Sequence, residues 1–151
     1  RGFLKAQSKG AIKPGLVLDK EGNVLGGHKG IAYYTIGQRQ GLGIAKGYPL
    51  YISRIDPKNN QITAGRKEDV LKKEFLVKGA HFVLGPIKKK VALSVRIRYN
   101  HKEAPAEVMP LGSKIKVRFR SPQFAITPGQ AAVFYDRDTV LGGGIIDRVL
   151  D

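Results

Sequence analysis

The sequence predicts a mainly β protein with two domains. Its 19 Gly and 8 Pro residues interrupt the chain about every eight to fifteen residues, and no long apolar pattern of helical period is present. The second half alternates apolar and basic residues with a period of two, which is typical of strands with one buried face. We therefore expect a small β-rich domain with one or two short helices over residues 1–80. A six-stranded antiparallel β-barrel should follow over residues 81–151.

Two hairpins are expected in the first domain. LVLDKEGNVL (16–25) places a turn at residues 20–23 between two short apolar runs. PLYISRIDPKNNQITAG (49–65) contains the turn segment 56–60. The proline of this segment restricts φ and its asparagines tolerate left-handed backbone, so both features favour a turn.

The helices of this domain are expected to be short. GIAYYTIGQRQGLG (30–43) predicts one helix that ends at Gly41 or Gly43, because glycine readily adopts the backbone conformation that follows a helix. RKEDVLKKEF (66–75) predicts one further helical turn.

The barrel strands should follow a linker at GPIKKK (85–90). KVALSVRIRY (90–99) and KIKVRFR (114–120) each alternate an apolar face with a basic one, whereas AAVFY (131–135) and TVLGGGII (139–146) predict a closing hairpin. The glycines of the last segment indicate close strand packing or a bulge. The expected inward residues are Val91, Leu93, Val95, Ile97, Tyr99, Ile115, Val117 and Phe119.

The net charge predicts a polyanionic partner. The chain has 27 basic and 12 acidic residues, a formal charge of +15, and the excess is spread over both halves. Nucleic acid is the commonest partner of such a surface, and an anionic membrane surface is the alternative. The sequence has no run of eighteen apolar residues and no secretory signal, and its start at Arg1 indicates a fragment or a processed chain.

Several kinds of catalytic site are not indicated. The absence of cysteine excludes thiolate nucleophiles, disulfides and cysteine-ligated zinc within these 151 residues. His28, His81 and His101 have no partners at metal-ligand spacing, and GLGIAKG (41–47) neither follows a clear strand nor opens a helix. The chain alone therefore does not resemble an enzyme.

Two basic strand faces are candidate RNA contacts. Residues on one face of a strand lie roughly 6.5–7 Å apart, a spacing comparable with successive phosphates of a nucleic-acid strand, about 3.4 Å along the axis for each charge. Arg96 lies on one such face, and Lys116, Arg118 and Arg120 lie on the other. A solvated barrel surface without a ligand remains the alternative.

Two shorter motifs combine polar and aromatic groups. Arg98 can bind a phosphate while Tyr99 stacks on a base, or Tyr99 can belong to the core with Arg98 at the surface. In FRSPQFAITPGQAAVFY (119–135), Gln130 follows a Pro-Gly turn and offers both a donor and an acceptor. That segment is either a ligand-contacting loop or a plain β-turn.

A third motif, HKGIAYYTIGQRQGLG (28–43), surrounds two tyrosines with polar and basic residues that include Lys29 and Arg39. Basic residues interleaved with aromatic ones can bind single-stranded RNA. The alternative is that the tyrosines pack a small core.

These segments, taken in order, resemble one family. GLVLDKEGNVLGGHKGIAYYTIGQRQGLGIA, PLYISRIDPKNNQITAG, VRIRY and SPQFAITPGQAAVFYDRDTVLGGGII are similar to the central domain and C-terminal β-barrel of the bacterial tRNA-specific 2-thiouridylases. The resemblance implies an enzyme that activates the wobble uridine of tRNA with ATP and magnesium. A cysteine persulfide, loaded by a sulfur-relay donor protein, then delivers sulfur to form 2-thiouridine.

The resemblance also implies where the chemistry occurs. The ATP loop and both catalytic cysteines belong to an N-terminal domain, and RGFLKAQSKGAIKPG resembles the segment that follows the second cysteine. This chain would then bind tRNA, carry no cofactor, be inactive alone and lie in the cytoplasm, away from membranes. Arg98, Tyr99 and Gln130 match tRNA-contacting positions of the family, whereas Lys29 and Arg39 receive no role from it.

Two other functions remain open. One is a stand-alone RNA-binding β-barrel protein of ribosomal or translation-factor type. The other is a protein that binds membrane surfaces, which predicts a basic amphipathic helix that the sequence does not contain.

Overall fold

The structure, a computed structural model, describes residues 12–151 and divides the chain into two units. The first ends at Val70 and the second comprises Leu71–Asp151. The observed boundary therefore comes ten residues before the one expected between residues 80 and 81. The reason is that β5 (Leu71–Phe82) is one continuous strand that belongs to the second unit. Residues 1–11, most of the segment expected to follow the second catalytic cysteine, lie outside the described residues.

The first unit is built on a four-stranded mixed sheet with the strand order β2-β1-β4-β3. Both predicted hairpins are confirmed: β1 pairs with β2, and β3 pairs with β4, each antiparallel. β1 and β4 are parallel neighbours. The strands are β1 (Gly15–Leu18), β2 (Val24–His28), β3 (Tyr51–Asp56) and β4 (Gln61–Gly65).

Aspartates stabilise both hairpin turns. The Asp19 carboxylate accepts hydrogen bonds from the backbone N–H groups of Glu21 and Asn23 at 3.0 and 2.8 Å. Asp56 accepts from the Asn59 amide group at 2.8 Å. These bonds reproduce turn geometry with side-chain oxygens, so the turns form where the sequence predicts them.

The helix predicted within residues 30–43 forms, but its predicted end at Gly41 or Gly43 is wrong. Only a single 3₁₀ turn forms there, at Ile31–Tyr33. Beyond it the chain pairs with β3 instead, because Gly37 N–H donates to the Ile52 carbonyl at 2.7 Å and Ile52 N–H donates to the Gln38 carbonyl at 2.9 Å. The turn predicted within residues 66–75 is confirmed as the 3₁₀ turn Lys67–Val70.

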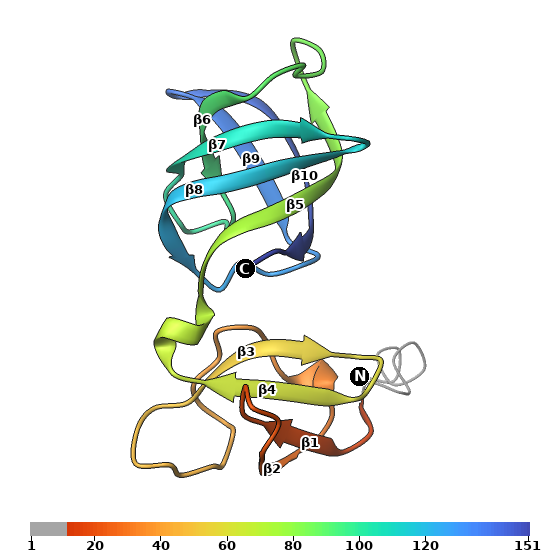
Figure 1. Cartoon of the computed structure of the whole chain (residues 1–151), viewed down its shortest axis with the longest axis vertical. Coiled ribbons are helices and arrows are strands. Elements are labelled where there is room, and N and C mark those ends of the chain that lie inside the picture. The colour runs from red at the N-terminus through yellow and green to blue at the C-terminus, as the bar shows by residue number, and fades with distance from the viewer. Residues whose placement is uncertain (1–11) are drawn as a thin grey trace. The chain divides into compact units, whose positions relative to one another are not determined.

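The second unit is a closed six-stranded barrel with the order β10-β5-β8-β7-β6-β9, and each strand pair is antiparallel (Figure 1). The fold class is therefore confirmed. The remaining strands are β6 (Val91–Arg96), β7 (Ala104–Leu111), β8 (Lys114–Phe124), β9 (Ala131–Asp136) and β10 (Thr139–Val149).

The barrel core confirms the alternation expected from the sequence. Ile115, Val117 and Phe119 of β8 are buried, and Phe119 lies 5.7 Å from Phe75 of β5 between ring centroids. Tyr99 does not belong to this core, since its side chain is 92% exposed. The prediction that it lies on the inward face is wrong because β6 ends at Arg96, three residues earlier.

The glycines of β10 permit close strand packing, as the sequence predicts. A Cβ at Gly142 would lie 2.1 Å from the His81 carbonyl oxygen, and one at Gly144 would lie 2.9 Å from the Lys78 carbonyl oxygen. The pairing register of β10 shifts at these glycines: between Gly143 and Ile145 in its pairing with β5, and between Val140 and Gly142 in its pairing with β9. The run therefore lets β10 bend to close the barrel.

Candidate nucleic-acid interface

Gln130 lies at the end of a tight turn between β8 and β9. Gln130 N–H donates to the Thr127 carbonyl at 3.2 Å, with Pro128 second in the turn and Gly129 third at φ 91°. This arrangement is typical of a type II turn. Two backbone bonds of 2.8 Å join Gly129 and Gln130 to Ile146 of β10, so the backbone is well anchored while the Gln130 side chain is exposed.

Arg98 connects this segment to the turn after β6. Its Nη2 donates a hydrogen bond of 3.0 Å to the carbonyl oxygen of Ala125. The same oxygen accepts a 2.8 Å hydrogen bond from Thr127 Oγ1. Arg98 is half-buried, and its guanidinium has five N–H donors, so donors remain for an external anion.

Tyr99 follows Arg98 directly and is 92% exposed. An exposed aromatic side chain beside a cation is suited to stacking on an unpaired base. The structure thus links Arg98, and with it the turn that carries Tyr99, to the segment before Gln130 through the Ala125 carbonyl oxygen, twenty-seven residues later in the chain.

The predicted basic row on β8 is partly neutralised. Glu74 of β5 lies 3.1 Å from Lys116 Nζ and 3.9 Å from Arg118 Nη1. These pairs were not foreseen, because β5 was not recognised as a strand next to β8. Arg120 is exposed and makes no ion pair with any described residue, so it is the most available cation of the row.

Arg96 lies on the outer face of β6, with its guanidinium carbon 5.5 Å from the centroid of the Tyr135 ring on β9. This distance is within the range of a cation–π contact. Lys90, just before the start of β6, is paired with Glu107 at 3.3 Å. The basic face of β6 is therefore partly occupied by contacts within the barrel.

Lys29 and Arg39 lie in the first unit, which the structure describes separately from the barrel. Lys29 is exposed, next to a structural histidine: Gly30 N–H donates to His28 Nδ1 at 3.0 Å, which leaves His28 Nε2 to donate to the Asn60 carbonyl at 2.9 Å. A Cβ at Gly15 would lie 2.6 Å from this Nε2. His28 is thus a packing residue of the sheet.

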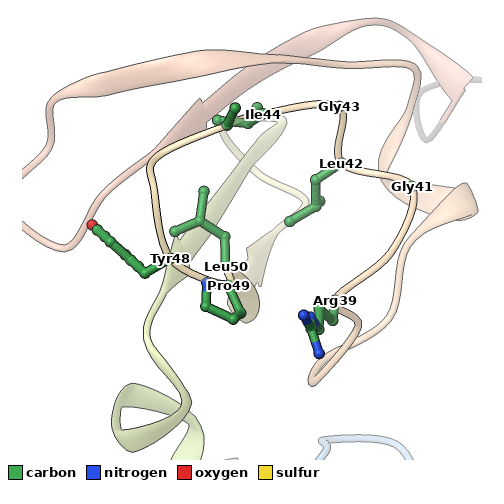
Figure 2. Close-up of a pocket in the computed structure, with 9 residues that line it drawn as sticks. Arg39, Gly41, Leu42, Gly43, Ile44, Tyr48, Pro49 and Leu50 are labelled. Atoms are coloured by element: carbon green, nitrogen blue, oxygen red, sulfur yellow. The ribbon is translucent and has the colours of Figure 1, made fainter.

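Arg39 lies at the edge of a surface pocket of about 350 Å³. Figure 2 shows Leu42 and Leu50 directed into the space that the loop encloses. The side chain of Gln38 holds the backbone on both sides of Arg39. Its amide oxygen accepts from Thr35 N–H at 3.0 Å, and its amide nitrogen donates to the Gln40 carbonyl at 2.8 Å. Gln38 therefore shapes the loop through both ends of its side-chain amide.

The glycine-rich segment 41–47 does not fit an ATP site. Residues 41–45 line this pocket, and the segment leads into β3, not into a helix whose N-terminal N–H groups would bind phosphates. Among residues 12–151, no group of three or more His, Asp or Glu side chains is placed to hold a metal ion. No helix within the same residues is long and apolar enough to cross a membrane.

One acidic residue in the barrel is strongly engaged. Asp147 of β10 lies 2.6 Å from Lys114 Nζ and 3.9 Å from Lys78 Nζ. The hydrogen bond from Lys114 and the positive charges of Lys114 and Lys78 lower the pKa of Asp147 below its ordinary value of 3.8. Lys78 and Lys114 are thereby less available to an RNA ligand than exposure alone indicates.

Thr127 and Ala125 are site residues that the sequence did not single out. Ala125 is buried and has φ 58°, a left-handed conformation unusual for a non-glycine residue. Nothing in the pattern SPQFAITPGQ indicates this conformation or the role of the Ala125 carbonyl. Only its proximity to the Pro-Gly turn pointed to the segment.

Domain comparisons agree with this division of the chain. Residues 1–66 match the tRNA methyl transferase PRC-barrel domain, and residues 72–146 match the aminomethyltransferase beta-barrel domain. The chain is thus a tandem of two β domains of a tRNA-modifying class.

Similar proteins define the family more closely. The chain is 45% identical over 151 residues to the tRNA-specific 2-thiouridylase MnmA 2 of Clostridium botulinum strain Langeland, covering 99% of this chain and 43% of the relative. It is 47% identical to MnmA 1 of Caldanaerobacter subterraneus subsp. tengcongensis, over 98% of this chain and 41% of that protein. MnmA 2 of Thermoanaerobacter sp. strain X514 is also 47% identical, with 99% and 42% covered.

The chain therefore belongs to the tRNA-specific 2-thiouridylase family, and it spans less than half the length of these relatives. The resemblance inferred from the sequence motifs is confirmed.

Proposed function

We propose that this chain is the tRNA-binding portion of a tRNA-specific 2-thiouridylase, in which Arg98, Tyr99 and Gln130 contact the tRNA. The observation that carries the proposal is the Arg98–Ala125 hydrogen bond, which joins the turn that carries Tyr99 to the segment that leads to Gln130. Arg98 bonds Ala125, Tyr99 is 92% exposed, and the Ala125–Gln130 segment presents an exposed amide. A cation suits a phosphate, an aromatic ring can stack on a base, and an amide can bond a base edge or a ribose hydroxyl.

The charge of the barrel unit supports the same partner. Arg120, Lys88 and Lys89 are exposed and form no ion pair within residues 12–151. Lys29, Arg39 and Arg96 are proposed as weaker contacts, as are Lys116 and Arg118 once Glu74 releases them. Phosphate contacts of this kind provide affinity and orientation, whereas the amide and the aromatic ring set the register.

We further propose that the complete enzyme uses ATP with magnesium and a cysteine persulfide to convert the wobble uridine to 2-thiouridine. These 151 residues contain no cysteine, and the glycine-rich segment does not fit ATP, so the chain alone would be inactive. The ATP site, the catalytic cysteines and the contact with a sulfur-relay donor protein would belong to another part of a cytoplasmic enzyme.

The division has a physical rationale. A base that is modified on an enzyme must leave its stack, which costs a few kcal/mol. Binding free energy from contacts elsewhere on the tRNA offsets this cost, and it also distinguishes a folded tRNA from other RNA.

The test is the double variant Arg98→Ala/Gln130→Ala in the enzyme that contains this chain. We expect weaker binding of a tRNA transcript with uridine at the wobble position, measured by filter binding, with ATP binding unchanged by calorimetry. Unchanged tRNA affinity would refute the assignment. The 151-residue chain should itself bind the transcript weakly, with affinity that falls as salt rises.

A further inference from the structure

The segment that carries Gln130 has an unusual backbone conformation that two side chains stabilise. Ala125, the first residue after β8, has φ 58° and is buried. An alanine in left-handed geometry persists only where surrounding contacts compensate for the strain. Here the contacts are two hydrogen bonds to the Ala125 carbonyl oxygen, from Arg98 Nη2 at 3.0 Å and from Thr127 Oγ1 at 2.8 Å.

Thr127 acts at both ends of the segment. Its hydroxyl bonds Ala125 two residues earlier, and its carbonyl oxygen accepts the N–H of Gln130 three residues later, at 3.2 Å. Between these bonds Ile126 is only 3% exposed and packs in the barrel core. The hydroxyl therefore lies between the constrained backbone of Ala125 and the turn that ends at Gln130.

The far side of the turn is already held by β10. Gly129 N–H donates to the Ile146 carbonyl, and Ile146 N–H donates to the Gln130 carbonyl, each at 2.8 Å. Two sets of contacts thus hold the backbone from which the Gln130 side chain extends: the strand pairing with Ile146 and the Ala125–Thr127 contact. The strand pairing with Ile146 does not involve Thr127 itself. Within residues 12–151, the bond from its hydroxyl to the Ala125 carbonyl is the contact that ties the start of the turn to the preceding segment.

We propose that Thr127, together with Arg98, is a positioning residue for tRNA binding: the shared Ala125 carbonyl orients the turn that presents Gln130. The inference rests on the proposed function and deepens it. Arg98 then has two roles at once, since one guanidinium donor orders the Gln130 turn while the others remain for phosphate. Thr127 does not touch the tRNA and acts only through Gln130.

The test uses a double-mutant cycle in the 151-residue chain, with binding of the wobble-uridine tRNA transcript as readout. Thr127→Val removes the hydroxyl at nearly constant shape, Thr127→Ser keeps it, and Gln130→Ala removes the group to be positioned. From the usual contribution of one hydrogen bond, we expect Gln130→Ala and Thr127→Val each to weaken binding by about threefold to tenfold. Thr127→Ser should remain within about twofold of the parent.

The decisive comparison is the double variant Thr127→Val/Gln130→Ala. If Thr127 acts through Gln130, the double variant should bind no more weakly than Gln130→Ala alone. Additive losses would overturn the inference, because they would mean that the Thr127 hydroxyl meets the RNA directly or supports another contact. Parent-like binding by Thr127→Val would overturn it as well.

Failure of the proposed function gives a different pattern. If Gln130→Ala binds like the parent chain, Gln130 is not a tRNA contact, and both the proposed function of this residue and the positioning role of Thr127 are wrong. If Gln130→Ala weakens binding but Thr127→Val does not, only the positioning role is wrong. Thr127→Ala serves in place of Thr127→Val should the valine variant unfold, and thermal unfolding of every variant checks the fold.

Discussion

The guanidinium of Arg98 donates a hydrogen bond of 3.0 Å to the carbonyl oxygen of Ala125, twenty-seven residues later in the chain. The bond joins the turn after β6 to the segment before β9, and each of these carries one exposed candidate contact, Tyr99 and Gln130 respectively. Because Arg98 is only half-buried, the same side chain also reaches solvent. The geometry therefore makes Arg98 both a structural element and a candidate phosphate ligand.

The two roles of Arg98 can be separated by charge. Arg98→Lys keeps the positive charge but lacks the planar fork through which arginine would bond Ala125 and a phosphate together under the proposed function. We expect Arg98→Lys to weaken tRNA binding while the slope of log affinity against log salt stays unchanged. Arg98→Ala should weaken binding further and reduce that slope by about one unit. Equal slopes for the two variants would contradict a phosphate contact.

Much of the fold could be predicted from local patterns, because hairpins and alternating strands depend on neighbouring residues. β8 alternates buried and accessible residues over 114–120, and both turns of the first unit contain Asp, Asn, Pro or Gly at suitable positions. β5 was missed because LKKEFLVKGAHF has three consecutive buried residues, Phe75, Leu76 and Val77, and no clear alternation. β7 was missed because Pro105 and Pro110 are unfavourable for a paired strand.

The candidate site was harder to predict than the fold. Gln130 and Arg98 could be selected from their sequence motifs, but their connection through Ala125 depends on a left-handed alanine that no motif indicates. The pairing of Lys116 with Glu74 depends on β5 lying beside β8. Such contacts arise from barrel closure, so residue spacing along one strand cannot reveal them.

Glu74 should act as an intramolecular competitor of the RNA. Its carboxylate pairs with Lys116 and Arg118, so Glu74→Gln releases two cations on the outer face of β8. We expect tighter tRNA binding with a steeper dependence on salt, at a loss of folding stability of less than about 1 kcal/mol for partly exposed ion pairs. Filter binding at several salt concentrations measures the first effect.

The matched control is Glu21→Gln, which removes the same charge from an exposed position of the first unit. A control that increases affinity as much as Glu74→Gln would show that only net charge matters. In that case the β8 row would not be a specific contact surface.

Gly142 should be essential to barrel closure. In Gly142→Ala the added Cβ would meet three backbone atoms of His81 and Phe82, between 2.1 and 3.0 Å away, and backbone atoms of a paired strand cannot move aside easily. We expect a loss of about 1–3 kcal/mol or more in the free energy of unfolding, as in other overpacked sites. Urea denaturation measures it. In Gly143→Ala the nearest atom to the added Cβ is the Ala132 carbonyl oxygen, 3.0 Å away, so the loss of stability should be smaller. Equal losses in the two variants would contradict the argument.

Asp147 should contribute to the acid sensitivity of the barrel. The hydrogen bond and charge of Lys114, followed by the charge of Lys78, lower the pKa of Asp147 below its ordinary value of 3.8. Since the folded state binds this proton more weakly than the unfolded state, the stabilisation is fully present above the ordinary pKa. It is lost as pH falls through the lowered pKa of the folded state.

We therefore expect Asp147→Asn to lower the thermal unfolding midpoint at neutral pH and to flatten its decline below about pH 4. Lys114→Met should reproduce much of this flattening, because it removes the main cause of the lowered pKa. Asp138→Asn, at an exposed carboxylate without an ion pair among the described residues, is the control and should leave the profile nearly unchanged. Because the pairs are partly exposed, high salt should also diminish the difference between Asp147→Asn and the parent chain. If Asp147→Asn and the parent chain gave parallel pH profiles at low salt, the ion pairs of Asp147 would not stabilise the folded barrel.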